Sequence, residues 1–436
     1  MEFTKTYYET LDETVYSATH KSGLKVILIK KPGFKKSYAT FSTKYGSINT
    51  EFVVPGETES TRVIDGVVHF LEHKVFEQPD GSNAFNDFSK YGASANANAF
   101  TSFGVTNYLF SCTDYFYENL EILLDFVQTP YFTEENVEKE KGIIAQEIRM
   151  YEDDAEQTCM YNCLEAMYEN HPVRINIAGG VEDIMKTTPE LLYKCYNTFY
   201  HPSNMALICV GDVDENKIWD CVEKYIKQDS PHGEITQVFP KEDKKVYKRR
   251  IEAKFDIPMP MFMIGFKDPE TGGSSEEILK REILTSCVLR TLFGRSSNFY
   301  KKLYDEGTIN KSFSPFYEYE QSCGYAAFFG EAENVDKIEK EIFKTAVKAK
   351  EQGIDKDAFE RVKKVLAGNF MEILDSVEDF GNEYMMAYHK GANLYDYAKL
   401  CENVTVEEAE ERLDTLFREE QCSTSIVFPK GRGVNE

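Results

Sequence analysis

Two histidines and one glutamate stand within the run 67–76, which is apolar nearly throughout. His69 and His73 are four residues apart, so on a helix they share one face and both imidazoles can reach a single point. Glu72 stands between them, which makes the pattern H-x-x-E-H, the reverse of the H-E-x-x-H zinc-binding helix. Two neutral imidazoles suit a borderline-soft cation such as zinc. The carboxylate beside them is then placed to take a proton from an attacking water.

The run 67–76 predicts a buried helix that Asp65 caps and that the turn at 79–81 ends. A five-residue pattern is weak by itself, because a buried histidine is more often hydrogen-bonded in a core than bound to a metal. A catalytic zinc also needs a third protein ligand and an open position for water. On this motif alone, a pair of core histidines remains an equal alternative.

A second predicted helix, over 133–151, supplies acidic candidates for the third ligand. On a helical wheel, Glu140 and Glu147 fall inside the apolar stripe formed with Ile144 and Ile148, within an arc of roughly 100°. A carboxylate buried in such a stripe needs a metal, a hydrogen-bond donor or a proton. The pattern therefore argues against a solvated face and leaves a metal site and a buried ion pair as the two interpretations.

The combined spacing resembles the pitrilysin/insulinase family of inverted-zincin metallopeptidases. Glu147 follows the H-x-x-E-H motif by 74 positions, counted from His73, and Glu140 precedes Glu147 by seven. The resemblance implies that His69, His73 and Glu147 bind Zn²⁺ and that Glu72 is the general base. It further implies that Glu140 has a catalytic role in which it orients a ligand or the water.

A third segment agrees with this resemblance. Residues 98–102, read Asn-Ala-Phe-Thr-Ser, are followed by Thr106-Asn107-Tyr108 and resemble the edge strand that binds substrate backbone in this family. The implied substrate is a peptide that adds to this edge as a further strand. The implied substrate-binding residues are Asn98, Ala99, Phe100 and Thr101. The resemblance extends over the whole chain. Among the members of the family, the chain most resembles half-length bacterial proteins associated with modification of elongation factor P.

The chain also repeats its own pattern. The apolar segment 261–266 mirrors a strand predicted at 37–45, and Thr188-Pro189 and Thr405-Val406 open similar helices 217 residues apart. We therefore expect an α+β fold of two tandem homologous domains, each a mostly antiparallel sheet flanked by helices. The resemblance implies that the two face each other across a chamber, as in the mitochondrial processing peptidase. The expected division is a catalytic domain over 1–230, a linker over 231–247 and a second domain over 248–436.

Further elements follow from local pattern. Strands are predicted at 24–31, in a pair within 93–112 and at 206–210, and helices at 84–90, 115–128 and 155–170, with a loop over 46–64. In the second copy, the zinc-helix counterpart carries Ser286, Leu289 and Arg290 at the motif positions. The counterparts of Glu140 and Glu147 are Val362 and Asn369. The fold thus keeps its apolar pattern without the acids and imidazoles, which indicates that these serve chemistry.

One family feature is missing. Members carry an Arg and a Tyr in R-x-x-x-x-x-G-Y in the second copy, and these are thought to hold the substrate carbonyl. At the best local match Lys301 replaces the Arg and Thr308 the Tyr. Two explanations stay open: an inactive paralogous subunit supplies the clamp, or Lys301 or the nearby Tyr304 substitutes within a monomer or homodimer.

Composition limits the function classes. A net charge of −24 argues against nucleic acid and against anionic membrane surfaces as partners. No basic and apolar leader and no long apolar run is visible, and ten cysteines without C-x-x-C predict reduced thiols in the cytoplasm. We therefore expect a cytoplasmic zinc metalloendopeptidase. One alternative is a non-catalytic or assembly subunit that keeps the metal site. A second is a thiol-dependent enzyme, for which the sequence shows no supporting Cys–His pairing.

Overall fold

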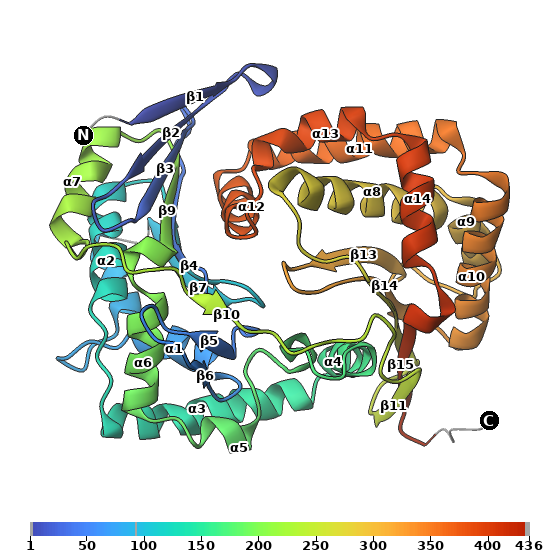
Figure 1. Cartoon of the computed structure of the whole chain (residues 1–436), viewed down its shortest axis with the longest axis horizontal. Helices are drawn as coiled ribbons and strands as arrows, with labels where there is room; N and C mark the ends of the chain where they lie inside the picture. The colour runs from blue at the N-terminus through green and yellow to red at the C-terminus, as the bar shows by residue number, and fades with distance from the viewer. Residues whose placement is uncertain (1–2, 92–93, 432–436) are drawn as a thin grey trace. The chain divides into compact units, whose positions relative to one another are not determined.

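The computed structural model describes residues 3–91 and 94–431, and the chain forms two compact units (Figure 1). The first unit comprises the chain up to Ile148, together with Asn176–Val238 and Glu372–His389. The second comprises Arg149–Ile175, Phe239–Met371 and the chain from Lys390 onward. Both units are therefore discontinuous in sequence. The division into domains at 1–230 and 248–436 stays a prediction about homologous halves, and the compact units differ from it by two exchanged segments.

A seven-stranded sheet forms the centre of the first unit, in the order β1-β2-β3-β9-β4-β8-β7. Neighbouring strands are antiparallel except β3 and β9, which are parallel. The bounds are β1 Thr4–Tyr8, β2 Glu13–Thr19, β3 Lys25–Lys30, β4 Ser37–Thr43, β7 Ala95–Thr101, β8 Thr106–Cys112 and β9 Met205–Gly211. A small second sheet, ordered β10-β5-β6, contains β5 Glu51–Val53, β6 Ser60–Arg62 and β10 Thr236–Gln237. The predicted loop over 46–64 therefore contains two short strands.

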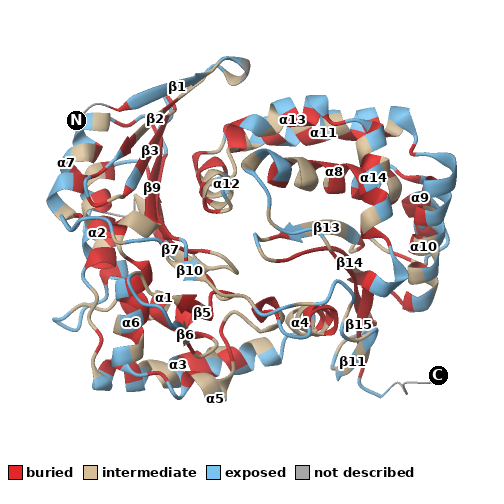
Figure 2. Cartoon of the chain, viewed as in Figure 1, coloured by how far each residue is buried: buried red, intermediate tan, exposed pale blue. Residues whose placement is uncertain are grey.

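The helices of the first unit cover the central strands. They are α1 Val67–Val75, α2 Phe116–Gln128, α3 Glu134–Glu152, α5 Val181–Ile184, α6 Pro189–Phe199, α7 Glu215–Tyr225 and α12 Val377–His389, with 3-10 turns at Glu9–Leu11, Ala84–Ser89 and Pro202–Asn204. Every residue of β4 and β9 is buried, as Figure 2 shows, so both faces of the sheet are covered there. Thr188 caps α6 as predicted, whereas the predicted helix at 84–90 is a 3-10 turn.

The second unit repeats this arrangement. Its sheet has the order β11-β15-β12-β14-β13, with β11 and β15 parallel and the other pairs antiparallel, which matches β3-β9-β4-β8-β7 strand for strand. The strands are β11 Arg250–Phe255, β12 Met261–Lys267, β13 Ser314–Tyr319, β14 Gly324–Glu331 and β15 Cys422–Pro429. The helices are α4 Ala155–Met167, α8 Ser275–Phe293, α9 Asn298–Asp305, α10 Val335–Gln352, α11 Lys356–Leu374, α13 Tyr397–Asn403 and α14 Val406–Leu416, with 3-10 turns at Pro172–Arg174, Leu394–Asp396 and Glu419–Gln421. The predicted α+β fold of two similar units is confirmed.

Each half of the chain gives one helix to the sheet of the other unit. The helix that follows α3 is α4, and it packs on β11, β12 and β15. The helix that follows α11 is α12, and it packs on β4 and β9. Gly381 of α12 lies so close to Tyr38 of β4 that a Cβ would come within 2.4 Å of the tyrosine ring. This exchange accounts for the discontinuity of both compact units.

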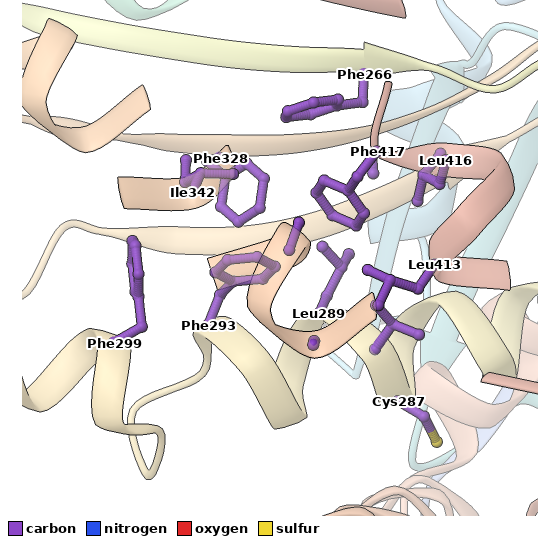
Figure 3. Close-up of a cluster of buried hydrophobic side chains, with 14 of the residues drawn as sticks. Phe266, Cys287, Leu289, Phe293, Phe299, Phe328, Ile342, Leu413, Leu416 and Phe417 are labelled. Atoms are coloured by element: carbon purple, nitrogen blue, oxygen red, sulfur yellow. The ribbon is translucent and has the colours of Figure 1, made fainter. Parts of the chain in front are cut away.

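Aromatic rings fill the core of the second unit (Figure 3). Phe293 of α8 lies 4.9 Å from Phe328 of β14, and Phe266 of β12 lies 4.7 Å from Phe417, measured between ring centroids. Leu289, which stands at the motif position of Glu72, is buried in this core. The position that holds the polar Glu72 in the first copy therefore holds an apolar core residue in the second copy. In the described part of the chain, no helix is long and apolar enough to cross a membrane.

Candidate metal centre

The helix α1 begins where the backbone of Gly66 lies against the backbone of Ala178. Its N-cap is Gly66 at φ 83°, and a Cβ on this residue would stand 2.3 Å from the carbonyl oxygen of Ala178. Only glycine fits this left-handed position and this close contact. The predicted cap by Asp65 is wrong, because the Asp65 carboxylate instead accepts a hydrogen bond from Arg62 at 3.3 Å. The contact between Gly66 and Ala178 thus sets where the helix starts.

His69, His73 and Glu147 come together as the sequence predicts. Their ligand atoms all lie within 4.8 Å of one another, and they are the only such group of three His, Cys, Asp or Glu in the described part of the chain. Nε2 of His69 is 3.7 Å from Oε1 of Glu147, and Nε2 of His73 is 3.4 Å from Oε2 of the same carboxylate. The two helices α1 and α3 therefore converge on one point through these three side chains.

This donor set fits zinc. Zinc–nitrogen and zinc–oxygen bonds of about 2.0–2.2 Å in a tetrahedral site place neighbouring ligand atoms about 3.3–3.6 Å apart. The separations of 3.4 and 3.7 Å between imidazole nitrogens and carboxylate oxygens are close to that range. Two imidazoles and one carboxylate also leave a fourth position open, as in catalytic sites. The ligand roles of these residues stay predictions that this geometry supports.

Glu140 fixes the orientation of His73. Oε1 of Glu140 lies 3.1 Å from Nδ1 of His73, so the ring donates its Nδ1 proton there and keeps Nε2 for a metal. Burial alone would lower the pKa of His73, but the hydrogen bond to Glu140 and the charges of Glu72, Glu140 and Glu147 raise it above the ordinary value. Burial by itself would raise the pKa of the Glu140 carboxyl. The hydrogen bond from His73 and the charge of His73 outweigh this effect and lower the pKa.

The environment of His69 differs from that of His73. Its side chain is buried, and burial followed by the charge on His73 lowers the pKa of His69 to about 4. Its Nδ1 has no hydrogen-bond partner among the described residues. A ring kept neutral in this way has a free lone pair, which is the form that binds a metal.

Glu72 lies on α1 beside the two imidazoles and contacts the strand β7. Its Oε2 accepts a hydrogen bond from Oγ1 of Thr101 at 2.6 Å. Burial raises the pKa of Glu72, against the opposing effects of the Thr101 hydrogen bond and the charge on His73. A general base benefits from such a raised pKa, because the ideal value lies near the working pH.

Two charged residues next to the site, Lys74 and Glu77, were not predicted from the sequence. The side chain of Lys74 is fully buried, its Nζ donates a hydrogen bond to Glu77, and it lies 3.8 Å from Oε2 of Glu140. Burial lowers the pKa of Lys74 to about 8, against the raising effect of Glu140. The signal was a lysine inside an apolar helical run with a glutamate three residues later.

The predicted substrate strand is the edge of the sheet. Within the described chain β7 pairs with β8 alone, so its other side is a sheet edge to which a further strand could add. The Ala99 N–H donates a hydrogen bond of 2.9 Å to Oδ1 of Asn98. Asn98 is exposed, and Ala99 and Phe100 are half-buried. Of the four residues predicted to bind substrate, Thr101 contacts Glu72, which lies beside the proposed metal ligands, through its side-chain hydroxyl. Substrate binding by this strand stays a prediction.

The segment with the altered clamp lies on and after α9 in the second unit. Lys301 is exposed, and Tyr304 is 41 % exposed and stacks on Tyr300 with ring centroids 5.7 Å apart. Oγ1 of Thr308 accepts a hydrogen bond from Lys337 at 2.8 Å. The hydroxyl at the tyrosine position of the motif is thus engaged within its own unit.

Three of the other histidines and all ten cysteines have structural surroundings. His389 contacts Ser42 at 2.8 Å, and the rings of His201 and His232 lie 4.2 Å apart beside Ser203. All ten cysteines are buried and free. Cys159 and Cys163 of α4 pack against the backbone of β15.

Comparison with known proteins agrees with this geometry. The profile described as Insulinase (Peptidase family M16) matches residues 26–180, and the profile described as Peptidase M16 inactive domain matches residues 186–366. The uncharacterized zinc protease YmfH of Bacillus subtilis is 42 % identical over 425 residues, which cover 97 % of this chain and 98 % of that protein.

A solved structure and a shorter match complete the comparison. The crystal structure of an M16-like peptidase from Alicyclobacillus acidocaldarius has a TM-score of 0.91 and 33 % identity, and covers 99 % of each chain. The B. subtilis protein named as a probable inactive metalloprotease, YmfF, is 26 % identical over 166 residues, which are 37 % of this chain and 38 % of that protein. The relatives of this chain thus include proteins named as zinc proteases and one named as a probable inactive metalloprotease.

Proposed function

Because the chain belongs to the insulinase family of M16 peptidases, we propose that it is a zinc-dependent endopeptidase acting on peptides or small unfolded proteins. The observation that carries the proposal is the convergence of His69, His73 and Glu147, with the Glu72 carboxylate beside them. When bound, zinc supplies a Lewis acid that polarises the scissile carbonyl and makes water more acidic. No other group of three such ligands stands in the described residues.

The residues of the chain have separate roles in this proposal. Glu72 takes a proton from the attacking water while the oxygen of that water bonds to the carbonyl carbon. Glu72 then gives this proton to the leaving amine as the C–N bond breaks. Glu140 holds His73 in the tautomer that keeps Nε2 available. Asn98, Ala99, Phe100 and Thr101 offer backbone groups to an extended peptide, which adds to the open edge of β7.

A glutamine at position 72 tests the proposal. Glu72→Gln keeps the size of the side chain and its acceptor oxygen for Thr101 but removes the base, so it should bind zinc and peptide and lose almost all turnover. The measurements are zinc content by elemental analysis, peptide affinity by calorimetry and cleavage of a peptide library by mass spectrometry. Cleavage by Glu72→Gln at the wild-type rate would rule out this mechanism.

The partner proposal starts from Lys301 and Thr308. They stand where the family motif has Arg and Tyr, and Thr308 is already hydrogen-bonded to Lys337. We propose that a paralogous subunit without H-x-x-E-H supplies the clamp, so that the chain is the active member of a heterodimer. Substitution by Lys301 or Tyr304 in a monomer or homodimer is the competing arrangement.

A non-catalytic assembly subunit with a retained metal site is the alternative function. It would bind zinc and a partner chain but cleave no peptide in any combination, and the same assays distinguish it. The cytoplasmic location and the link to modification of elongation factor P stay predictions. Affinity purification of the chain from its native cell, followed by mass spectrometry of the bound proteins, tests the partner and the link together.

A further inference from the structure

Thr101 ends the edge strand β7 and contacts the side chain that is proposed as the general base. Its Oγ1 donates a hydrogen bond of 2.6 Å to Oε2 of Glu72. We propose that Thr101 is a positioning residue that orients the Glu72 carboxylate, and that its side chain is not a substrate contact. The catalytic meaning of this role rests on the proposed peptidase function, whereas the orientation of the carboxylate does not.

The need for such a contact follows from the freedom of a glutamate side chain. Glu72 has three side-chain torsions, and its last torsion is broad, so the carboxylate can turn unless a partner holds it. A hydroxyl bound to Oε2 fixes the plane of the carboxylate and leaves Oε1 to receive the proton of the attacking water. A hydrogen bond to a carboxylate is also stronger than one between neutral groups.

Thr101 is itself held rigidly. Its backbone stands opposite Thr106 in the β7–β8 pair, and Oγ1 of Thr106 donates to the carbonyl of Tyr45 at 2.8 Å. The next residue, Ser102, donates its N–H to Val105 and accepts from the N–H of Ser47. A β-branched side chain has few accessible χ1 rotamers, so a fixed backbone also fixes the hydroxyl.

Thr101 contacts Glu72 through its side-chain hydroxyl, and a backbone hydrogen bond of Thr101 also acts on the Glu72 carboxyl. Side chains alternate along a strand, so Thr101, Ala99 and Ala97 share the face that packs on α1, while Asn98 and Phe100 lie on the other. Backbone N–H and C=O groups point sideways in the plane of the sheet, where an added peptide strand would pair. The hydroxyl of Thr101 therefore aligns the base from the face of the sheet and not from its open edge.

Two variants distinguish positioning from substrate contact. Thr101→Val keeps shape and removes the hydroxyl, and Thr101→Ser keeps the hydroxyl. With the zinc-loaded full chain, Thr101→Val should lower kcat about 10- to 100-fold and change KM by less than about twofold, because one charge-assisted hydrogen bond to the base is lost. Thr101→Ser should recover kcat to within about threefold of wild type. Zinc affinity, measured by chelator competition, should be the same in all three proteins.

Crystal structures of the wild type and both variants give a readout that needs no activity. We expect the Glu72 carboxylate of Thr101→Val to be turned or in two conformations, and that of Thr101→Ser to stay in place. An unmoved carboxylate in Thr101→Val, or a raised KM with unchanged kcat, would overturn the positioning role. If the zinc-loaded wild type cleaves no peptide, the proposed function fails, and the carboxylate position still decides the role of Thr101.

Discussion

Oε1 of Glu140 and Nδ1 of His73 are 3.1 Å apart, so the helix α3 holds an imidazole of the helix α1 by a single hydrogen bond. The same α3 helix presents Glu147 to Nε2 of His73 at 3.4 Å. Two acids seven residues apart therefore address the two nitrogens of one ring. Their different positions predict different effects on zinc.

Removal of a proposed ligand should abolish stable zinc binding. His69→Ala, His73→Ala and Glu147→Gln each leave two protein ligands of three, so we expect zinc content after gel filtration to fall by at least about tenfold. Glu140→Gln keeps all three ligands and loses only the charge that holds His73, so its zinc affinity should fall about 10- to 100-fold.

Elemental analysis and competition with a fluorescent chelator measure both effects. Glu138→Gln is a matched control, because Glu138 lies on the same α3 helix, is exposed and pairs with Lys141. It should leave zinc affinity unchanged. Full zinc retention in Glu147→Gln would refute its ligand role, and an unchanged affinity in Glu140→Gln would refute the orienting role.

Lys74 and Glu77 predict a test of stability. Lys74→Met leaves the Glu77 and Glu140 carboxylates without their buried cation, and we expect the free energy of unfolding to fall by about 1–3 kcal/mol. The double variant Lys74→Met/Glu77→Gln removes one of those carboxylate charges and should be less destabilised than the single variant. Urea titrations of the metal-free proteins measure this. A double variant that is as unstable as the sum of both single variants would show that the two side chains do not interact.

The clamp hypothesis predicts dependence on a second chain. If a paralogue supplies the missing donors, the isolated chain should cleave peptides about 10²–10³ times more slowly than the mixture with that paralogue. Mass photometry shows whether the two form a heterodimer, and peptidase assays with and without the paralogue measure the rate. Strong cleavage by the isolated chain that Lys301→Ala or Tyr304→Phe abolishes would favour substitution within one chain instead.

The similarity of the two units could be predicted from repeated segments of the sequence, and the grouping of His69, His73 and Glu147 from local pattern. An apolar run predicts a buried helix, and four-residue spacing places His69 and His73 on one face whatever the helix packs against. A position in the apolar stripe turns Glu147 inward for the same reason. These inferences need only the period of a helix.

The exchange of α4 and α12 could not be predicted in this way. An amphipathic helix shows that one face is covered but does not identify the covering sheet, and both helices pack on the sheet of the other half. The Asp65 cap failed because the contact between Gly66 and Ala178 is long-range. The strands β1 and β2 were missed, and β1 in particular is mostly exposed and has little apolar alternation.

His389 of the exchanged helix α12 predicts a pH dependence of stability. Burial lowers the pKa of His389 to about 3, below the value near 6.5 of an unfolded histidine, and the charge of Lys44 acts in the same direction. Between these two values the unfolded chain binds a proton that the folded chain does not. The contribution of this group is therefore fully present above about pH 6.5 and is lost as the pH falls toward 3, by up to about 1.4 kcal/mol per pH unit.

His389→Gln keeps a hydrogen-bonding side chain beside Ser42 but does not titrate. In urea titrations of the metal-free proteins from pH 7.5 to pH 4.5, the wild type should lose stability more steeply than the variant, since the carboxylates that titrate in this range are common to both. Parallel curves for the two proteins would contradict a neutral, buried His389.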